Sequence, residues 1–529
     1  MSGVGPTITA LEGSLREVVR TRRSSPSIAI ELTAAAGAAL VTVLFAANAA
    51  LAGEVSSQAA GLFLLLVLFV GALAAGLAVL EPWAGLLAWL IVMPVLNASR
   101  LGLTLGGLFV TNSTILVACL VLGTVLASRS GRVRLQKVPG PVLALATAVS
   151  LVAILSGALA ADRGLGISIA LHGVVEPAIL AVIACLLIDR RRRVVALAVA
   201  MVLSVAIATL YNMERLLRLS FDLAVAQSDR TGFARFTYYN VGIYGDMLVM
   251  TLPLAIGLLL YTRTRTTSRP VRLAVLGLIV LLAIGLYLTF TKGPWLAGLL
   301  VITGLLVVTA TSWRARAATV LVAALLAMLI VPYPLYAIRA IDSALADQML
   351  SVVQGLQGGS RADSWDPETA EGEVSITERA LATRAAVAMA IDHPLVGVGP
   401  GNFADAYANQ YKPPEATRSL HSAHDMFADV AAEFGLPLAA LLVVAFFGAG
   451  LVAIGLGRRG PPGTRVLGLA LGASVAGFLI VGFTFGVDLY RPYRIMNSDV
   501  LFAALLLSGI VALARTRRLE SDSKASATP

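Results

Sequence analysis

Two histidines and an aspartate lie close together in the segment "SLHSAHDMFADVAAEFG", residues 419–435. A helix that begins near His421 and ends at Gly435 would put His421 and His424 on one face, with Asp425 adjacent. Histidine titrates near neutral pH, so His424 or His421 is suited to act as a general base toward a hydroxyl group. The alternative is that both histidines are polar caps of the helix. No metal site is expected, because the segment has neither an HExxH pattern nor a cysteine cluster.

Three further ionisable residues lie inside apolar runs. His172 and Glu176 are four residues apart in one run, and Asp246 lies near the end of another. Charged groups at membrane depth are costly and are candidates for function. A pair of His172 and Glu176 that only satisfies itself is an equally good interpretation.

The composition identifies the class of protein that must position these residues. The chain has 529 residues, of which 58% are hydrophobic and 13% charged, and its mean hydropathy is +0.86. Soluble domains contain about 25% charged residues, so this is an integral membrane protein. The formal net charge of +10 does not indicate a nucleic-acid partner, because the basic residues form short clusters between apolar runs.

We therefore predict an all-α polytopic membrane protein with about fourteen membrane helices, within a range of twelve to fourteen. Both termini, 1–27 and 515–529, are expected in the cytoplasm because the basic loops then all fall on one side. The predicted spans cover residues 28–52, 58–80, 83–98, 110–127, 140–160, 166–188, 194–211, 241–262, 273–291, 295–311, 318–338, 436–457, 466–487 and 500–514.

Two segments of substance fall on the outer side in this topology. The smaller, 212–240, interrupts the first block of helices (28–338), and the larger, 339–435, precedes the last block (436–514). The larger segment holds six Lys or Arg and fourteen Asp or Glu, and we expect it to form a small helical domain. Its capping box "SITE" (375–378) predicts a helix up to Asp392, and "GVGPGNF" (397–403) predicts a turn whose glycines adopt positive φ.

Five cations lie on the predicted outer side, although the basic clusters of the chain fall on the cytoplasmic side. Together they are suited to bind a diphosphate through bidentate guanidinium bonds and an ammonium charge, although any one of them could be an ordinary surface residue. They are Arg230, Arg235, Lys292, Arg379 and Arg384.

In order along the chain, the motifs "RTGF…YYN", "TFTKGPWL", "ERALATRAAVAMAIDHPLVGVGPGNF" and "HSAHDMFADVAAEFG" resemble those of the O-antigen ligase and polymerase superfamily. The family's His-Asn…Glu-x-Gly element matches His424, Glu433 and Gly435, with Asp425 in place of Asn. Arg379 matches the arginine fourteen residues before His393. Arg230 and Asn240 resemble the arginine and asparagine of the smaller loop, and Lys292 replaces a usual arginine.

The resemblance implies an inverting, metal-independent and cofactor-free glycosyl transfer on the outer side of the cytoplasmic membrane. The donor would be a glycan on a polyprenyl diphosphate, and the acceptor a hydroxyl of a lipid, glycan or protein. His424 would deprotonate the acceptor, with Asp425 and Glu433 as further catalytic candidates, while the cations hold the diphosphate. A ligase and a polymerase are not distinguished. A flippase or transporter of lipid-linked glycans is the alternative of another class, but no internal repeat supports it.

Overall fold

The computed structural model describes residues 58–98, 102–105, 108–218, 241–264, 268–289, 291–330, 376–485 and 498–525. The predicted span 28–52 lies outside this part of the chain. So do three predicted site residues of the smaller loop, Arg230, Arg235 and Asn240. Lys292 begins a helix, but its side chain is also outside the described part.

Within the described residues the predicted spans are helical over nearly all of their length, but the span 110–127 begins with Val110 and Thr111 in a short strand. Eight helical stretches there are long and apolar enough to cross a membrane, which confirms an all-α, multi-pass membrane protein, while the total of fourteen stays a prediction. The helices are α3 (Gln58–Leu80), α4 (Pro82–Ala98), α5 (Asn112–Arg129), α6 (Gly140–Leu159), α7 (Arg163–Ala170), η2 (Leu171–Val175), α8 (Glu176–Leu187), α9 (Arg191–Arg218), α12 (Val241–Arg263), α13 (Arg269–Tyr287), α14 (Lys292–Thr309), α15 (Trp313–Ile330), α21 (Leu436–Arg459), α22 (Pro462–Phe485) and α23 (Ser498–Ala525).

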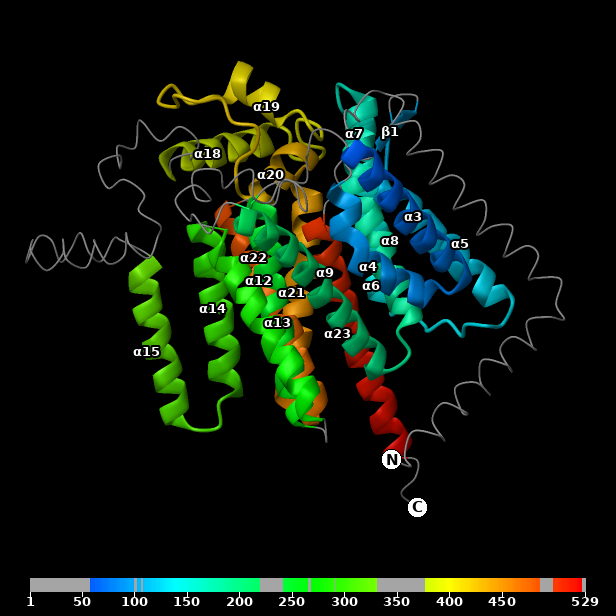
Figure 1. Ribbon diagram of the computed structural model, residues 1–529. Helices are drawn as coiled ribbons and strands as arrows, with labels where there is room; N and C mark the ends of the chain where they lie inside the picture. Colours follow the sequence, from blue (N-terminus) through cyan, green and yellow to red (C-terminus); the bar gives the residue numbers. More distant parts are fainter. Residues whose placement is uncertain are drawn as a thin grey trace, which may run out of the picture. The chain divides into compact units, whose positions relative to one another are not determined.

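The chain divides into two compact units. Figure 1 labels their helices. One contains α3, the start of α4 and most of α5. Its helices approach closely at glycines: a Cβ on Gly85 would lie 2.2 Å from the Cα of Ala78. The other unit holds the remaining elements, with α12 packed among α9, α13, α14 and α22.

A short hairpin, β1 (Gly102–Leu105) antiparallel to β2 (Leu108–Thr111), joins α4 to α5. The sequence analysis did not predict it. The sequence "GLTLGGLFVT" carries a hairpin signal, two short β-type runs separated by Gly106 and Gly107. The prediction assigned only its last two residues, Val110 and Thr111, to a span and left the rest without an element.

The predicted span 166–188 is not a uniform α-helix, because the π-helix η2 separates α7 from α8. His172 Nδ1 lies 2.8 Å from Glu176 Oε1, as the four-residue spacing predicts. The Ser113 and Thr114 hydroxyls also donate to this carboxylate, each at 2.6 Å. The contribution of α5 to this cluster could not be predicted from the sequence. The four side chains form a polar network at the π-helix, in which Ser113 and Glu176 are buried and His172 and Thr114 are half-buried. Asp246, in α12, is also buried.

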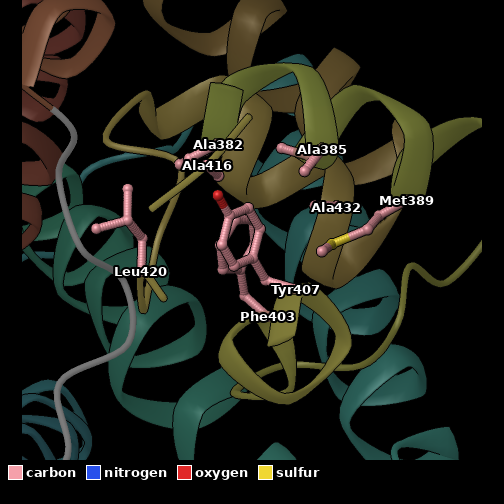
Figure 2. Packing of buried hydrophobic residues seen from close by; sticks show 10 residues of the cluster. Ala382, Ala385, Met389, Phe403, Tyr407, Ala416, Leu420 and Ala432 are labelled. Carbon is pink, nitrogen blue, oxygen red and sulfur yellow. The ribbon is translucent and has the colours of Figure 1, made fainter. Parts of the chain in front are cut away.

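Residues 376–435, which we call the α18–α20 segment, precede α21. They form α18 (Ile376–Asp392), α19 (Phe403–Ala406), η4 (Tyr407–Tyr411) and α20 (Met426–Phe434). The predicted helix up to Asp392 is confirmed by α18. The segment has its own apolar core, in which alanines of α18 and α20 let the stacked rings of Phe403 and Tyr407 approach closely (Figure 2).

The turn 397–403 wraps the end of α20. Gly397, Gly399 and Gly401 have φ of 67°, 96° and 84°, which confirms the predicted positive φ. The N–H groups of Val398 and Gly399 donate to the carbonyls of Ala432 (2.8 Å) and Glu433 (3.1 Å). These carbonyls have no partner within their own helix, so the turn caps α20.

We expect Gly397→Ala to destabilise the protein by about 2 to 5 kcal/mol. Its Cβ would lie 2.3 Å from the carbonyl carbon of Glu433, in a backbone conformation with positive φ. Gly448→Ala is the matched control, because a Cβ at this position in α21 meets no atom within 4 Å. Thermal unfolding of the purified proteins measures both. An equal melting temperature for the two variants would contradict the expectation.

Candidate functional site

The predicted helix over residues 421–435 is wrong at its start. The helix α20 begins at Met426, and Asp425 is its N-cap: Asp425 Oδ1 accepts from the N–H groups of Phe427 (3.0 Å) and Ala428 (2.9 Å). His424 has φ of 56°, which ends any continuation of the helix toward His421. The two histidines therefore do not share a helix face. They lie in the turn that leads into α20.

The two imidazoles are nevertheless neighbours. The ring centroids of His421 and His424 are 5.7 Å apart with the rings at 75°, so one edge faces the other ring. His421 is exposed and His424 is half-buried. Of the two, His424 has the more desolvated imidazole, which is the better environment for a ring that must be neutral to accept a proton.

Two hydrogen bonds, one through the N–H and one through the carbonyl of Ala423, fix the backbone immediately before His424. The N–H of Ala423 donates to Asp429 Oδ1 at 2.5 Å, and the carbonyl of Ala423 accepts from the Thr383 hydroxyl at 3.2 Å. Asp429 lies one turn into α20 and is buried, while Thr383 lies on α18. Positive φ costs a non-glycine residue about 1 to 2 kcal/mol, and these two bonds stabilise the chain in that conformation.

Thr383, which contacts the backbone before His424, lies on the same helix as the predicted arginines. Arg379 is four residues before Thr383, so the two lie on neighbouring turns of one side of α18. The single hydroxyl hydrogen of Thr383 is shared between the Arg379 carbonyl (3.0 Å) and the Ala423 carbonyl (3.2 Å). Arg379 is half-buried. Arg384 is five residues after Arg379, on another face of α18, and is exposed. The structure thus places Arg379 one turn before Thr383, which contacts the backbone directly before His424, and places Arg384 on another face.

Glu378 has a role that the capping box did not predict. Its Oε1 accepts from the Thr417 N–H (2.9 Å) and hydroxyl (2.7 Å), which clamps the chain before His421 onto α18. Burial acts to raise the pKa of Glu378, but these bonds, a bond from the Arg418 backbone and the charge of Lys412 outweigh it and lower the pKa. The clamp therefore stabilises the fold above the unfolded value of about 4.3 and loses strength as the pH falls further.

The two other carboxylates of the motif are both bonded to backbone. Glu433 is buried, and its Oε1 accepts from the Phe403 N–H at 3.2 Å, which fixes the start of α19 to the end of α20. Burial raises the pKa of Asp425 above its ordinary value, and the two bonds of the N-cap oppose that rise in part. Since the cap uses Oδ1 for both bonds, any orientation of an imidazole by Asp425 would use Oδ2.

Among the described residues, no group of three or more His, Cys, Asp or Glu side chains is arranged to hold a metal ion. The site within this part of the chain consists of His424 and Arg379 with their supports, Thr383, Asp429 and Glu378. The supports were missed by the sequence analysis. Thr383 and Ala423 are 40 residues apart and form no recognisable pattern.

We expect Asp429→Ala to release the turn before His424, because a hydrogen bond to a charged group contributes about 1.5 to 3 kcal/mol. Asp429→Asn keeps an acceptor for the Ala423 N–H and is the matched control. The chain has four histidines, so ¹⁵N-histidine NMR resolves each ring, with His424 assigned from His424→Gln. The His424 signal should shift and broaden in Asp429→Ala and recover in Asp429→Asn. An unchanged His424 signal in Asp429→Ala would show that this bond does not position the ring.

Comparison with known proteins gives one family match. Residues 276–443 match the family described as O-Antigen ligase. The matched residues include the start of α14 at Lys292, the whole α18–α20 segment with Arg379 and His424, and the start of α21. No curated protein matches the chain. Arg230, Arg235 and Asn240 precede the matched region.

Proposed function

Because the chain belongs to the O-antigen ligase superfamily, we propose that it transfers a glycan from a polyprenyl diphosphate to a hydroxyl acceptor. The proposed reaction occurs on the outer side of the cytoplasmic membrane, in the synthesis of a cell-surface polysaccharide. One observation carries the proposal: the Thr383 hydroxyl joins the Arg379 face of α18 to the backbone directly before His424. The proposal assigns the diphosphate to the cation of Arg379 and the acceptor hydroxyl to the half-buried imidazole of His424.

In the proposed step, His424 accepts the proton of the acceptor hydroxyl as its oxygen attacks the anomeric carbon. The bond from that carbon to the diphosphate oxygen breaks, and the polyprenyl diphosphate leaves as an anion. Attack from the face opposite the leaving group inverts the anomeric configuration. Because negative charge develops on the diphosphate, a preorganised cation such as Arg379 stabilises the transition state more than the ground state.

The remaining predicted residues keep subordinate roles in this proposal. Arg230, Arg235, Asn240 and Lys292 would add to the diphosphate site. Asp425 and Glu433 are proposed to act through position, because their carboxylates accept backbone N–H groups at the two ends of α20. The proposed chemistry needs no metal and no cofactor.

A transfer assay tests the proposal. The full chain in liposomes receives a polyprenyl-diphosphate glycan and, in separate reactions, a lipid acceptor or a second donor molecule as acceptor. The expected result is one free polyprenyl diphosphate for each new glycosidic bond, with inverted configuration and a rate unaffected by chelator. Product with the lipid acceptor identifies a ligase, and product with the second donor a polymerase. Movement of the donor across the bilayer without bond formation would contradict an enzyme and favour the transporter.

A further inference from the structure

One face of α18 exposes large apolar side chains outside the apolar core of its segment. Val387, Ile391 and Leu395 are 50%, 68% and 72% exposed. The two in α18 are four residues apart and share a face, and Leu395 lies in the turn after the helix. The opposite face of α18, with Ala382 and Met389, is buried in that core (Figure 2). The exposed residues, which we call the α18 stripe, therefore have no partner in that core.

The α18 stripe is continuous with the exposed surface of α21. The Leu436 N–H donates to the Pro394 carbonyl at 2.9 Å, and a Cβ on Gly435 would lie 2.5 Å from the carbonyl carbon of Leu395. Leu436, the first residue of α21, is 49% exposed. From there an apolar surface follows α21 along Val444, Phe447 and Leu451.

The chemistry of the continuous surface is that of a helix in contact with lipid. The helix α21 is long and apolar enough to span a membrane, so we expect its exposed residues to contact acyl chains. In Figure 1, α18 lies across the direction in which α21 and α22 run. Arg384 is exposed three residues before Val387 and adds a cation beside the stripe. An apolar face flanked by a basic residue is typical of helices that lie in the membrane interface.

We propose that α18 lies in the interface of the membrane leaflet at which α21 begins, with the α18 stripe among the acyl chains. Arg384 then lies among the phosphates of the lipid headgroups. Arg379, eight residues before Val387 on the same helix, is then held near the same depth, where the diphosphate of a membrane-anchored molecule also lies. The docking of α18 goes beyond the transfer reaction and does not depend on it.

Site-specific quenching tests the depth of the stripe. Cys119 and Cys185 are both buried, so a cysteine introduced for Ile391 can be labelled selectively with a fluorophore. The full chain is placed in nanodiscs of phosphatidylcholine and phosphatidylglycerol. Asn409→Cys is the control, because Asn409 is exposed on η4 of the same segment. We expect nitroxide-bearing lipid to quench the Ile391→Cys label severalfold more than the Asn409→Cys label, and aqueous iodide to do the reverse.

Two outcomes would overturn the proposal. Equal iodide quenching at both positions would place the stripe in water. A label at position 391 that neither quencher reaches would mean that another segment of this chain or a second copy covers the stripe. Val387→Cys repeats the measurement at a less exposed position should Ile391→Cys misfold. Because fluorescence is independent of turnover, a failed transfer assay would leave this result unaffected, and the reverse also holds.

Discussion

Replacing His424 by Ala should lower the single-turnover rate of glycan transfer about 10²- to 10⁴-fold, the usual contribution of a positioned general base. Donor binding should persist, since the imidazole acts on the acceptor. His421→Ala is the natural comparison, because its ring is only 5.7 Å from that of His424 but is exposed. We expect a much smaller loss for His421→Ala.

Because His424 has a positive φ, a second variant is needed beside His424→Ala. At φ of 56° alanine is strained, whereas asparagine adopts this conformation readily. His424→Asn therefore preserves the turn and removes the base, and it should be about as slow as His424→Ala. Rates across pH 5.5 to 8.5 complete the test: the parent should lose activity as the imidazole protonates, and the variants should lose that dependence. If His424→Asn transfers glycan at the parental rate, the base is another group, and Glu433 or Asp425 becomes the next candidate.

Arg379→Ala should weaken use of the lipid-diphosphate donor by about 10- to 150-fold, which corresponds to one charge-assisted contact of about 1.5 to 3 kcal/mol. The expectation follows from its place one turn before Thr383, which contacts the backbone directly before His424. Arg379→Lys keeps the charge but loses bidentate geometry, so it should recover only part of the loss.

Arg384→Ala is the matched control for Arg379→Ala. Both residues lie on α18, but Arg384 is exposed on a different face. The dependence of the transfer rate on donor concentration measures all three variants, with thermal unfolding as a check on folding. Equal losses for Arg379→Ala and Arg384→Ala would mean that the helix contributes only general positive charge. No loss in either would remove α18 from the diphosphate site.

The sequence predicted the helices well because long apolar runs need no tertiary information. The start of α20 was in principle readable, since Asp425 stands directly before the apolar run "MFADV" in the position of an N-cap. The sequence analysis placed the start earlier, near His421. The residue that decides the question, His424, adopts a conformation that its type does not predict.

The candidate site also has residues that the sequence predicted and residues that it did not. The types and order of Arg379, His424 and Glu433 were sufficient for the resemblance, but their supports were not readable. Glu378 had a local explanation as a capping-box residue, while its actual bond to Thr417 spans 39 positions. Likewise the positive φ of the glycines in 397–403 was predictable from composition, whereas their partner, the end of α20, was not. Pairings over such distances depend on how the helices pack.

The close spacing of these supports along the chain has a consequence for biogenesis. The clamps Glu378–Thr417, Thr383–Ala423 and Phe403–Glu433 close loops of only 39, 40 and 30 positions. Short loops cost little entropy to close and form quickly. The segment also packs on α6, where the Ser156 hydroxyl donates to the Val396 carbonyl at 2.7 Å. Ser156 is synthesised 240 residues before Val396. The α18–α20 segment can therefore begin to fold against α6 while the ribosome is still making α22 and α23. Its packing on α22, where the rings of Phe427 and Phe483 are 4.6 Å apart, must follow the synthesis of that helix.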